Sequence, residues 1–271
     1  MTDPNRPTYH YSSGGWMNDV IPFAEGDRLH VMFNHHKEAR FGRFRWGHAH
    51  TDDLLGWATE PYAIVPTRGG PDEGGVWTGS VVATPDGPAA FYTGITTFEP
   101  FTQVQCLARS SNTVTWHKHP APVIAERPDG YGDCWRDPYT WWDGDRWRML
   151  LGSAVRDRRT AAVLAYESDD LERWRFAGPL YIDDRGELGR EAECPELFAL
   201  GDRHVLVTSC GTTKALVGSL ADDGRFLPEG PAAAFDPATS YAARSVEVGG
   251  RRILNGRRVR DRRLDRSDHA E

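Results

Sequence analysis

The stretch Asp133-Cys134-Trp135-Arg136-Asp137-Pro138-Tyr139-Thr140-Trp141-Trp142 sets an arginine and an aspartate side by side within a run of aromatic residues. A charged pair among indole and phenol rings is unsuited to a hydrophobic core. It suits a sugar site, where rings stack on the sugar face and charged groups bind its hydroxyls. The stretch also opens a structural unit: a polar motif, a short apolar strand, a Gly144-Asp145-Arg146 turn and a second apolar strand.

This unit recurs along the chain. Every copy has a polar start, a glycine-containing turn and short apolar strands, the pattern that indicates a β-hairpin. Besides the copy just quoted, units begin at Gly15-Trp16-Met17-Asn18-Asp19, Val76-Trp77-Thr78-Gly79-Ser80, Glu191-Ala192-Glu193-Cys194-Pro195 and Tyr241-Ala242-Ala243-Arg244-Ser245. The five starts predict five equivalent units.

A second marker recurs between the units: a polar turn, then a tryptophan, then a proline. Its tryptophans are Trp57, Trp116 and Trp174, which are 59 and 58 residues apart. Repeats of this length, with about four short strands each, are typical of propeller blades. We therefore expect an all-β chain that folds as a five-bladed β-propeller with four antiparallel strands per blade.

The expected propeller is a single domain at residues 1–257, followed by a charged, flexible tail at 258–271. Ten tryptophans, 28 glycines and 18 prolines fit short strands and many turns better than helices. Because an open propeller exposes strand edges, residues near the N-terminus are expected to complete the last blade.

Composition narrows the function classes. A net charge of -7 and a pI near 5.8 argue against nucleic acid as the main partner, because phosphate binding needs a basic face. No apolar run reaches 18 residues, which argues against a membrane span. Residues 1–13 are polar and lack the apolar core of a signal peptide. The expected location is therefore the cytoplasm.

The cysteines and the histidines are the candidates for a nucleophilic or a metal-binding role. The four cysteines, at 106, 134, 194 and 210, lack zinc-ligand spacing and are expected to be reduced thiols. A nucleophilic role for Cys194 is the alternative to a packing role. His35, His36, His48 and His50 suggest zinc, but no carboxylate stands at ligand spacing, so neither a metal nor a cofactor is predicted.

Three acids carry the chemical argument. The first strand of each propeller blade lines the channel, so residues at the starts of units converge. Aligning units on their Gly-Asp-Arg turns places Asp19 and Asp137 eight residues before the turn aspartate, while Glu193 stands nine before it. A glycosidic bond needs one protonated and one ionised carboxyl. Converging acids therefore predict a glycosidase.

Six motifs in order resemble the signatures of glycoside hydrolase family 32, the β-fructofuranosidases. The resemblance spans roughly residues 14 to 257 and implies a five-bladed propeller, in agreement with the repeat count. The motifs are Trp16-Met17-Asn18-Asp19, Trp46-Gly47-His48-Ala49, Trp77-Thr78-Gly79-Ser80, Trp135-Arg136-Asp137-Pro138, Glu193-Cys194-Pro195-Glu196 and Gly250-Arg251-Arg252-Ile253.

The resemblance assigns roles residue by residue. It implies that Asp19 is the nucleophile, Glu193 the general acid/base and Asp137 the carboxylate that binds two ring hydroxyls and stabilises the transition state. For protonation near neutral pH, Glu193 needs a neighbouring negative charge, expected from Asp19, or a dry pocket, expected from Trp16, Trp77 and Trp135. The expected substrate-binding residues are Asn18, Arg136, Asn34, Trp46, Trp77, Ser80 and Trp16.

The chain departs from the family pattern in three places. Val20-Ile21-Pro22 follows Asp19 where the family usually has Pro-Asn-Gly, and Asn34 stands where a glutamine is common. The usual C-terminal β-sandwich is not expected, because the fifth unit lies near the end of the sequence. Simpler roles also exist for the acids. The simpler role is a turn cap for Asp19, an ion pair with Arg136 for Asp137, and an exposed acid in the acidic run 187–196 for Glu193.

The main hypothesis is a retaining glycoside hydrolase that acts on a β-fructofuranoside or similar furanoside through a covalent glycosyl-enzyme. One alternative is a tailoring enzyme, a hydrolase or transferase, for a furanoside in a small metabolite. Another is an inactive sugar-binding propeller. The expected partner is a small sugar, with neither nucleic acid nor membrane. The sequence leaves the oligomeric state open, with a dimer as one alternative.

Overall fold

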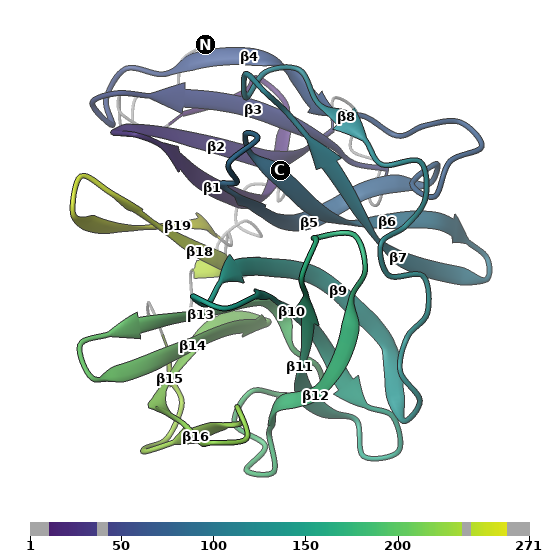
Figure 1. Cartoon of the computed structure of the whole chain (residues 1–271), viewed down its shortest axis with the longest axis vertical. Helices are drawn as coiled ribbons and strands as arrows, with labels where there is room; N and C mark the ends of the chain where they lie inside the picture. The colour runs from purple at the N-terminus through teal and green to yellow at the C-terminus, as the bar shows by residue number, and fades with distance from the viewer. Residues whose placement is uncertain (1–10, 37–42, 235–239, 259–271) are drawn as a thin grey trace, which may run out of the picture.

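The computed structural model describes residues 11–36, 43–234 and 240–258, and all its regular elements are β-strands (Figure 1). This agrees with the all-β prediction. Within these ranges, no helix is long and apolar enough to cross a membrane. Residues 1–10 and 259–271 lie outside the description, and with them nearly all of the predicted tail and the segment expected to close the last blade.

The strands form consecutive antiparallel sheets. The first sheet contains β1 (Trp16–Glu25), β2 (Arg28–His36), β3 (Arg45–Thr51) and β4 (Ala58–Ile64), and the second β5 (Gly75–Val82), β6 (Ala89–Phe98), β7 (Phe101–Arg109) and β8 (His117–Lys118). The third contains β9 (Tyr131–Trp142), β10 (Trp147–Val155), β11 (Thr160–Ser168) and β12 (Arg175–Ile182).

The fourth and fifth sheets complete the described part. The fourth contains β13 (Glu193–Leu200), β14 (Arg203–Cys210), β15 (Thr212–Leu220) and β16 (Phe226–Pro228), with β17 (Ala233–Ala234) also paired to β15. The fifth contains only β18 (Ser240–Val248) and β19 (Arg251–Arg258). The described residues thus show four blades of at least four strands and a fifth sheet of two strands.

The sheets follow one another around a centre (Figure 1). Their first strands, β1, β5, β9, β13 and β18, contact each other in that order, and β18 returns to β1. This is the architecture of a β-propeller, in which the first strand of each blade is innermost. The predicted propeller is confirmed, whereas the described residues do not show four strands in every one of five blades.

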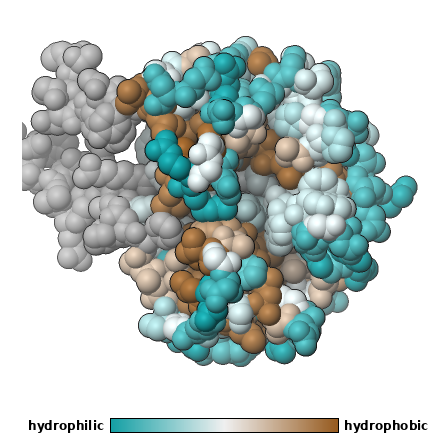
Figure 2. Space-filling model, turned by 60° about the vertical axis from the view of Figure 1, so that its left-hand side comes forward, coloured by the Kyte–Doolittle hydropathy of each residue, from teal (hydrophilic) through white to brown (hydrophobic). Residues whose placement is uncertain are grey.

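Hydrophobic side chains fill the space between neighbouring blades. One cluster joins the first two sheets through Met32, Trp46 and Tyr92, all almost fully buried, and similar clusters join the second to the third sheet and the third to the fourth. Some hydrophobic side chains also reach the surface among hydrophilic ones (Figure 2). Tyr11, the first described hydrophobic residue, packs on Phe33 and Trp57 of the first blade.

All five inner strands contain a register shift near their beginning. A β-bulge of this kind bends a strand and re-aims its side chains. The shifts fall at residues 18–20, 76–79, 136–139, 193–196 and 241–244. At three of them a residue other than glycine has a positive φ: 63° at Asp137, 48° at Cys194 and 52° at Ala242.

The bulges explain why Glu193 stands one residue away from the place of Asp137 in the repeat. Asp137, Cys194 and Ala242 occupy equivalent places, so Glu193 is level with Arg136 and not with Asp137. The alignment on Gly-Asp-Arg turns gives the same register, because Glu193 and Arg136 both stand nine residues before their turn aspartate. It also places Asp19 level with Asp137, each directly after the paired residue that precedes the bulge.

Candidate active site

Asp19, Asp137 and Glu193 line one pocket of about 130 Å³, here called the acidic pocket. The three residues belong to β1, β9 and β13, and all lie at or beside the bulge of their strand. The structure therefore brings together the three carboxyl groups that the sequence placed in separate units. The other lining residues are Asn18, Asn34, Phe44, Trp77, Thr78, Arg136, Cys194 and Tyr241.

Asp19 is oriented by a chain of hydrogen bonds from two other strands. The hydroxyl of Thr78 donates to Asp19 Oδ2 at 2.7 Å, and the amide of Asn34 donates to Thr78 Oγ1 at 2.9 Å. Thr78 and Asn34 are almost fully buried, so this chain is shielded from water. A buried hydroxyl that donates to one carboxylate oxygen fixes the direction of the other. Asp19 is therefore a held carboxylate and not a surface turn cap.

Asp137 is held where β9 meets β13. Its Oδ2 accepts a hydrogen bond from the main-chain N–H of Cys194 at 2.9 Å, and its own N–H donates to Thr93 Oγ1 at 2.9 Å. Arg136 Nε lies 4.0 Å from the same carboxylate. The ion pair with Arg136 thus exists, and it coexists with a place in the pocket. Only 3% of Asp137 is exposed.

Glu193 forms an ion pair with Arg136, and its side chain is 17% exposed. This overturns the reading of Glu193 as an exposed acid. Burial raises the pKa of Glu193 to about 7, and the charge of Asp137 also raises it, while Arg136 acts in the opposite direction. A carboxyl with a pKa near 7 is partly protonated at neutral pH, which suits a general acid.

The source of the perturbing charge differs from the sequence expectation. The carboxylates that raise the pKa of Glu193 are Asp137 and Glu191, whereas Asp19 was expected to supply the charge. Trp135, expected to keep the pocket dry, packs instead in the core between the second and third blades. Trp77 does line the pocket, and the guanidinium of Arg136 lies 5.7 Å from the centre of its ring.

Four predicted substrate-binding residues, Asn18, Asn34, Arg136 and Trp77, line the acidic pocket, and three others do not. Trp46 is fully buried, and its Nε1 donates to the carbonyl of Trp77 at 3.0 Å, so it supports Trp77 from behind. Trp16 is 55% exposed and is not part of the lining.

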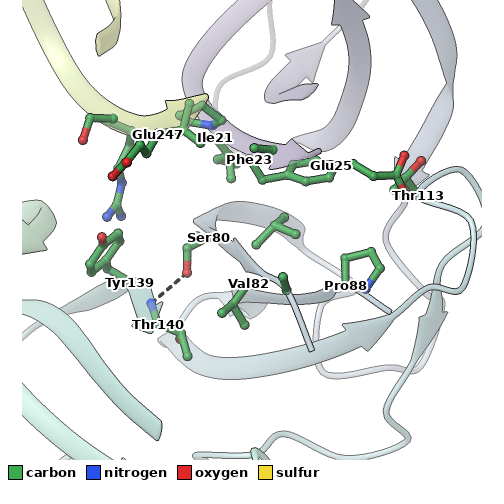
Figure 3. A pocket seen from close by; sticks show the side chains of 18 of the residues that line it. Ile21, Phe23, Glu25, Ser80, Val82, Pro88, Thr113, Tyr139, Thr140 and Glu247 are labelled. Atoms are coloured by element: carbon green, nitrogen blue, oxygen red, sulfur yellow. Dashed lines mark hydrogen bonds between the residues drawn. The ribbon is translucent and has the colours of Figure 1, made fainter. Parts of the chain in front are cut away.

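Ser80 is the third residue that lies elsewhere. It lines a separate cavity of about 550 Å³, here called the far pocket, where its hydroxyl accepts a hydrogen bond from Thr140 N at 3.0 Å (Figure 3). The physical reason is the bulge before Gly79, because the residues that follow it point into a different part of the channel.

Sequence reasoning missed four residues of the lining: Phe44, Thr78, Cys194 and Tyr241. Thr78 and Tyr241 stand at unit starts, so their position in the repeat was a usable signal. Burial raises the pKa of the Cys194 thiol well above its usual value, and Asp137 adds to the effect. A neutral, buried thiol beside carboxylates favours the packing role over a nucleophilic one.

His30 packs against His48 and His50, whereas His35 packs against Tyr62. His30 Nδ1 lies 2.9 Å from His48 Nε2 with the rings stacked, and His35 Nδ1 is hydrogen-bonded to Tyr62. Burial lowers the pKa of His30 to about 4 and that of His48 to about 3, so both are neutral at pH 7. Within the described ranges, no group of three histidine, cysteine or acidic residues has an arrangement that holds a metal ion.

Aromatic residues extend outward from the acidic pocket. The ring centre of Trp77 is 5.7 Å from that of Phe101, which is in turn 6.2 Å from Phe98 and stacked on it. Phe101 is 41% exposed and Phe98 37% exposed. These three residues, here called the aromatic strip, lead from the pocket wall to the surface at the β6–β7 hairpin. Large exposed rings of this kind often mark a binding surface.

Comparison with known proteins gives a consistent result. The model of the glycosyl hydrolases family 32 N-terminal domain matches residues 10–258. The sucrose-6-phosphate hydrolase of Escherichia coli is 35% identical over 214 residues, which are 75% of this chain and 43% of that protein. The chain thus spans less than half the length of this relative.

Two solved structures have the same fold. Fructan 1-exohydrolase IIa from Cichorium intybus superposes with a TM-score of 0.83 at 29% identity, covering 94% of this chain and 53% of that one. A β-fructofuranosidase from Bombyx mori gives a TM-score of 0.81 at 28% identity, covering 93% and 57%.

Proposed function

The chain belongs to glycosyl hydrolase family 32, and we propose that it hydrolyses a β-fructofuranoside with retention of configuration, through a covalent glycosyl-enzyme. The observation that carries the proposal is the convergence of Asp19, Asp137 and Glu193 in one pocket where Glu193 has a pKa of about 7. Retaining glycosidases use one carboxylate as nucleophile and one carboxyl as acid.

In the first step, the carboxylate of Asp19 attacks the anomeric carbon while Glu193 gives its proton to the oxygen of the leaving group. The bond from the anomeric carbon to that oxygen breaks, and an ester to Asp19 forms. Asp137 accepts hydrogen bonds from two ring hydroxyls and stabilises the positive charge that develops on the sugar. Its main-chain anchors to Thr93 and Cys194 keep it in place.

In the second step, the ionised Glu193 removes a proton from water, and the water oxygen attacks the anomeric carbon of the ester. The bond to Asp19 breaks, which frees the sugar and restores both carboxyl groups to their starting states. Arg136 suits this cycle, because its ion pair with Glu193 stabilises the charged form between the two steps.

We also propose that β18 and β19 are the inner half of a fifth blade, and that residues 1–257 are one catalytic domain. The support is the bulge of β18, where Ala242 has the same positive φ as Asp137 and Cys194. Tyr241 of this sheet also lines the acidic pocket, so the fifth sheet contributes to the site as the others do.

A second candidate is a tailoring enzyme for a furanoside that carries an apolar or aromatic group. The aromatic strip favours it, because Phe101 and Phe98 continue from Trp77 to the surface and offer ring faces to a leaving group outside the acidic pocket. An aromatic pair of this kind is worth about 0.5–1.5 kcal/mol beyond the area it buries.

The test is a comparison of turnover on four substrates: sucrose, sucrose 6-phosphate, 1-kestose and an aryl β-fructofuranoside. The first three follow from the names of the family relatives and their complexes. If the parent hydrolyses sucrose, sucrose 6-phosphate or 1-kestose and Asp19→Asn does not, the result supports a fructofuranosidase. Turnover restricted to the aryl compound, and weakened in Phe101→Ala, supports the tailoring enzyme. Sugar binding without turnover contradicts both and indicates a binding propeller.

A further inference from the structure

Arg244 of β18 is a buried cation that reaches two motifs far from it in sequence. Only 2% of the residue is exposed. One terminal nitrogen donates to the carbonyl oxygen of Asp137 at 3.0 Å, and the other donates to the carbonyl oxygen of Pro195. A single guanidinium therefore links the inner strands of the third, fourth and fifth sheets.

Both acceptors lie in bulges with strained backbone. Asp137 has a φ of 63°, and Cys194, the neighbour of Pro195, has a φ of 48°. A residue other than glycine in this region costs on the order of 1–3 kcal/mol and persists only when its surroundings enforce it. The N–H of Cys194 also donates to the Asp137 carboxylate, so the two bulges share one hydrogen-bonded unit.

A simple ion pair does not account for Arg244. Among the described residues, no carboxylate oxygen lies within 4.0 Å of its guanidinium, and the nearby Glu196 accepts hydrogen bonds from Ser245 instead. The guanidinium packs against the ring of Tyr139 at 5.5 Å. Burial of a cation is costly without good partners, and the two carbonyl groups are its hydrogen-bond acceptors, while the charge of the nearby Glu196 adds an electrostatic contribution.

Direct contact with the sugar does not account for it either. Arg244 lines the far pocket together with Tyr139 and Thr140, and it is not part of the acidic pocket lining. Arg244 therefore contacts the bulges through their carbonyl groups, whereas the carboxyl groups of Asp137 and Glu193 line the acidic pocket.

We propose that Arg244 is a positioning residue, which locks the bulges of β9 and β13 and so fixes Asp137 and Glu193 relative to each other. This inference rests on the proposed hydrolase function for its kinetic consequence, but not for its structural one. Misplacement of a catalytic group by about 1 Å can cost about 100-fold in rate. Loss of the guanidinium also leaves two buried carbonyl groups without donors.

The kinetic test compares Arg244→Met and Arg244→Lys with Arg252→Met. Arg252 is the control because it lines the same far pocket, donates to Ser245 Oγ, lies 3.9 Å from the Glu196 carboxylate and packs over Phe198, but donates to neither the Asp137 nor the Pro195 carbonyl. We expect Arg244→Met to lose about 100-fold in kcat/KM, Arg244→Lys to recover part of it, and Arg252→Met to stay within about threefold of the parent. Equal losses in Arg244→Met and Arg252→Met would overturn the proposal.

A double-mutant cycle separates positioning from general destabilisation. If Arg244 acts through Asp137, Arg244→Met should lower activity far less in an Asp137→Asn background than in the parent. Full additivity of the two changes contradicts the proposal.

Amide hydrogen exchange tests the structural claim without any activity. Exchange at Cys194 N–H should accelerate in Arg244→Met and remain slow in Arg252→Met at matched global stability. If the parent hydrolyses no fructofuranoside, the proposed function fails while this measurement still decides the role of Arg244. Unchanged exchange at Cys194 would overturn it.

Discussion

The acidic pocket and the far pocket share the inner strands β1, β5, β9 and β18, yet the three carboxyl groups of the proposed mechanism lie in the smaller pocket. On β5, Thr78 faces the acidic pocket and Ser80 the far pocket; on β9, Asp137 faces the first and Thr140 the second. The bulge between them changes the direction of the side chains. Volume is thus a poor guide, since the 130 Å³ pocket holds three carboxyl groups and the 550 Å³ pocket is largely apolar or neutral.

The largest expected effect appears when one substitution in the acidic pocket is compared with one in the far pocket. Asp19→Asn should lower turnover by on the order of 10⁴-fold or more, because the nucleophile of a two-step mechanism has no substitute. Thr140→Val in the far pocket replaces a buried hydroxyl with a methyl group of similar size. The turnover of this variant should stay within about threefold of the parent. Steady-state kinetics with matched melting temperatures checks both. Near-normal turnover in Asp19→Asn contradicts the assignment of the acidic pocket.

The next largest effect separates the roles of Glu193 and Asp137 in the acidic pocket. Glu193→Gln should cost 10²–10⁴-fold on substrates with poor leaving groups, the usual range for general acid catalysis. It should spare the first step on an activated aryl fructofuranoside, which needs no proton. Asp137→Asn should lower activity on both substrates alike, because it stabilises the sugar and not the leaving group. A burst of aryl alcohol separates the first step from the second.

The pH dependence follows from the pKa of Glu193, which burial raises to about 7. Only the protonated form assists the leaving group, so kcat/KM should fall above pH 7 by about tenfold per pH unit. Arg136→Met removes the cation that lowers this pKa, so the fall should begin at a higher pH. If the fall in kcat/KM occurs at the same pH after this substitution, a group other than Glu193 controls it.

The smallest effect concerns stability on the far-pocket side. Phe23 lines the far pocket and stacks on His30, which neighbours His48. Burial holds the pKa values of His30 and His48 at about 4 and 3, below the ordinary 6.5 of the unfolded chain. The unfolded state then binds more protons between pH 6.5 and 4, so stability is fully present above pH 6.5 and is lost as pH falls.

Urea unfolding at several pH values measures this loss. Two carboxylates lie beside these histidines: Glu25 is 3.7 Å from His30, and Glu60 is 3.3 Å from His50. Their negative charge reduces the loss of stability at low pH. His48→Gln should flatten the decline between pH 6.5 and 4, whereas His117→Gln, at an exposed position of β8, should leave it unchanged. The same decline in both variants would show that other groups cause it.

The sequence predicted much of this molecule for a clear physical reason. Alternating apolar strands, turn residues and evenly spaced tryptophans report local structure, and these features predicted the repeat and the convergence of Asp19, Asp137 and Glu193. The bulges were not visible in this pattern, because an extra residue in a strand does not disturb its composition. Ser80 was therefore expected at the acidic pocket although it lines the far pocket, and Thr78 was overlooked.

The sequence pattern also did not predict contacts between segments that are far apart in the chain. The hydrogen bonds of Arg244 to the carbonyls of Asp137 and Pro195 join positions 107 and 49 residues apart. The charge that raises the pKa of Glu193 also comes from an adjacent blade, through Asp137. Such effects depend on three-dimensional neighbours, which a one-dimensional pattern does not specify.

The most direct test of the central claim is to trap the intermediate on Asp19. Glu193→Gln should be mixed with an activated aryl β-fructofuranoside, quenched in acid, digested and analysed by mass spectrometry. The account predicts one fructosyl group on the peptide that contains Asp19, and none on the same peptide from a variant that also carries Asp19→Asn. A fructosyl group attached to Asp137 or Cys194 instead, or turnover without any adduct, would contradict the proposed mechanism.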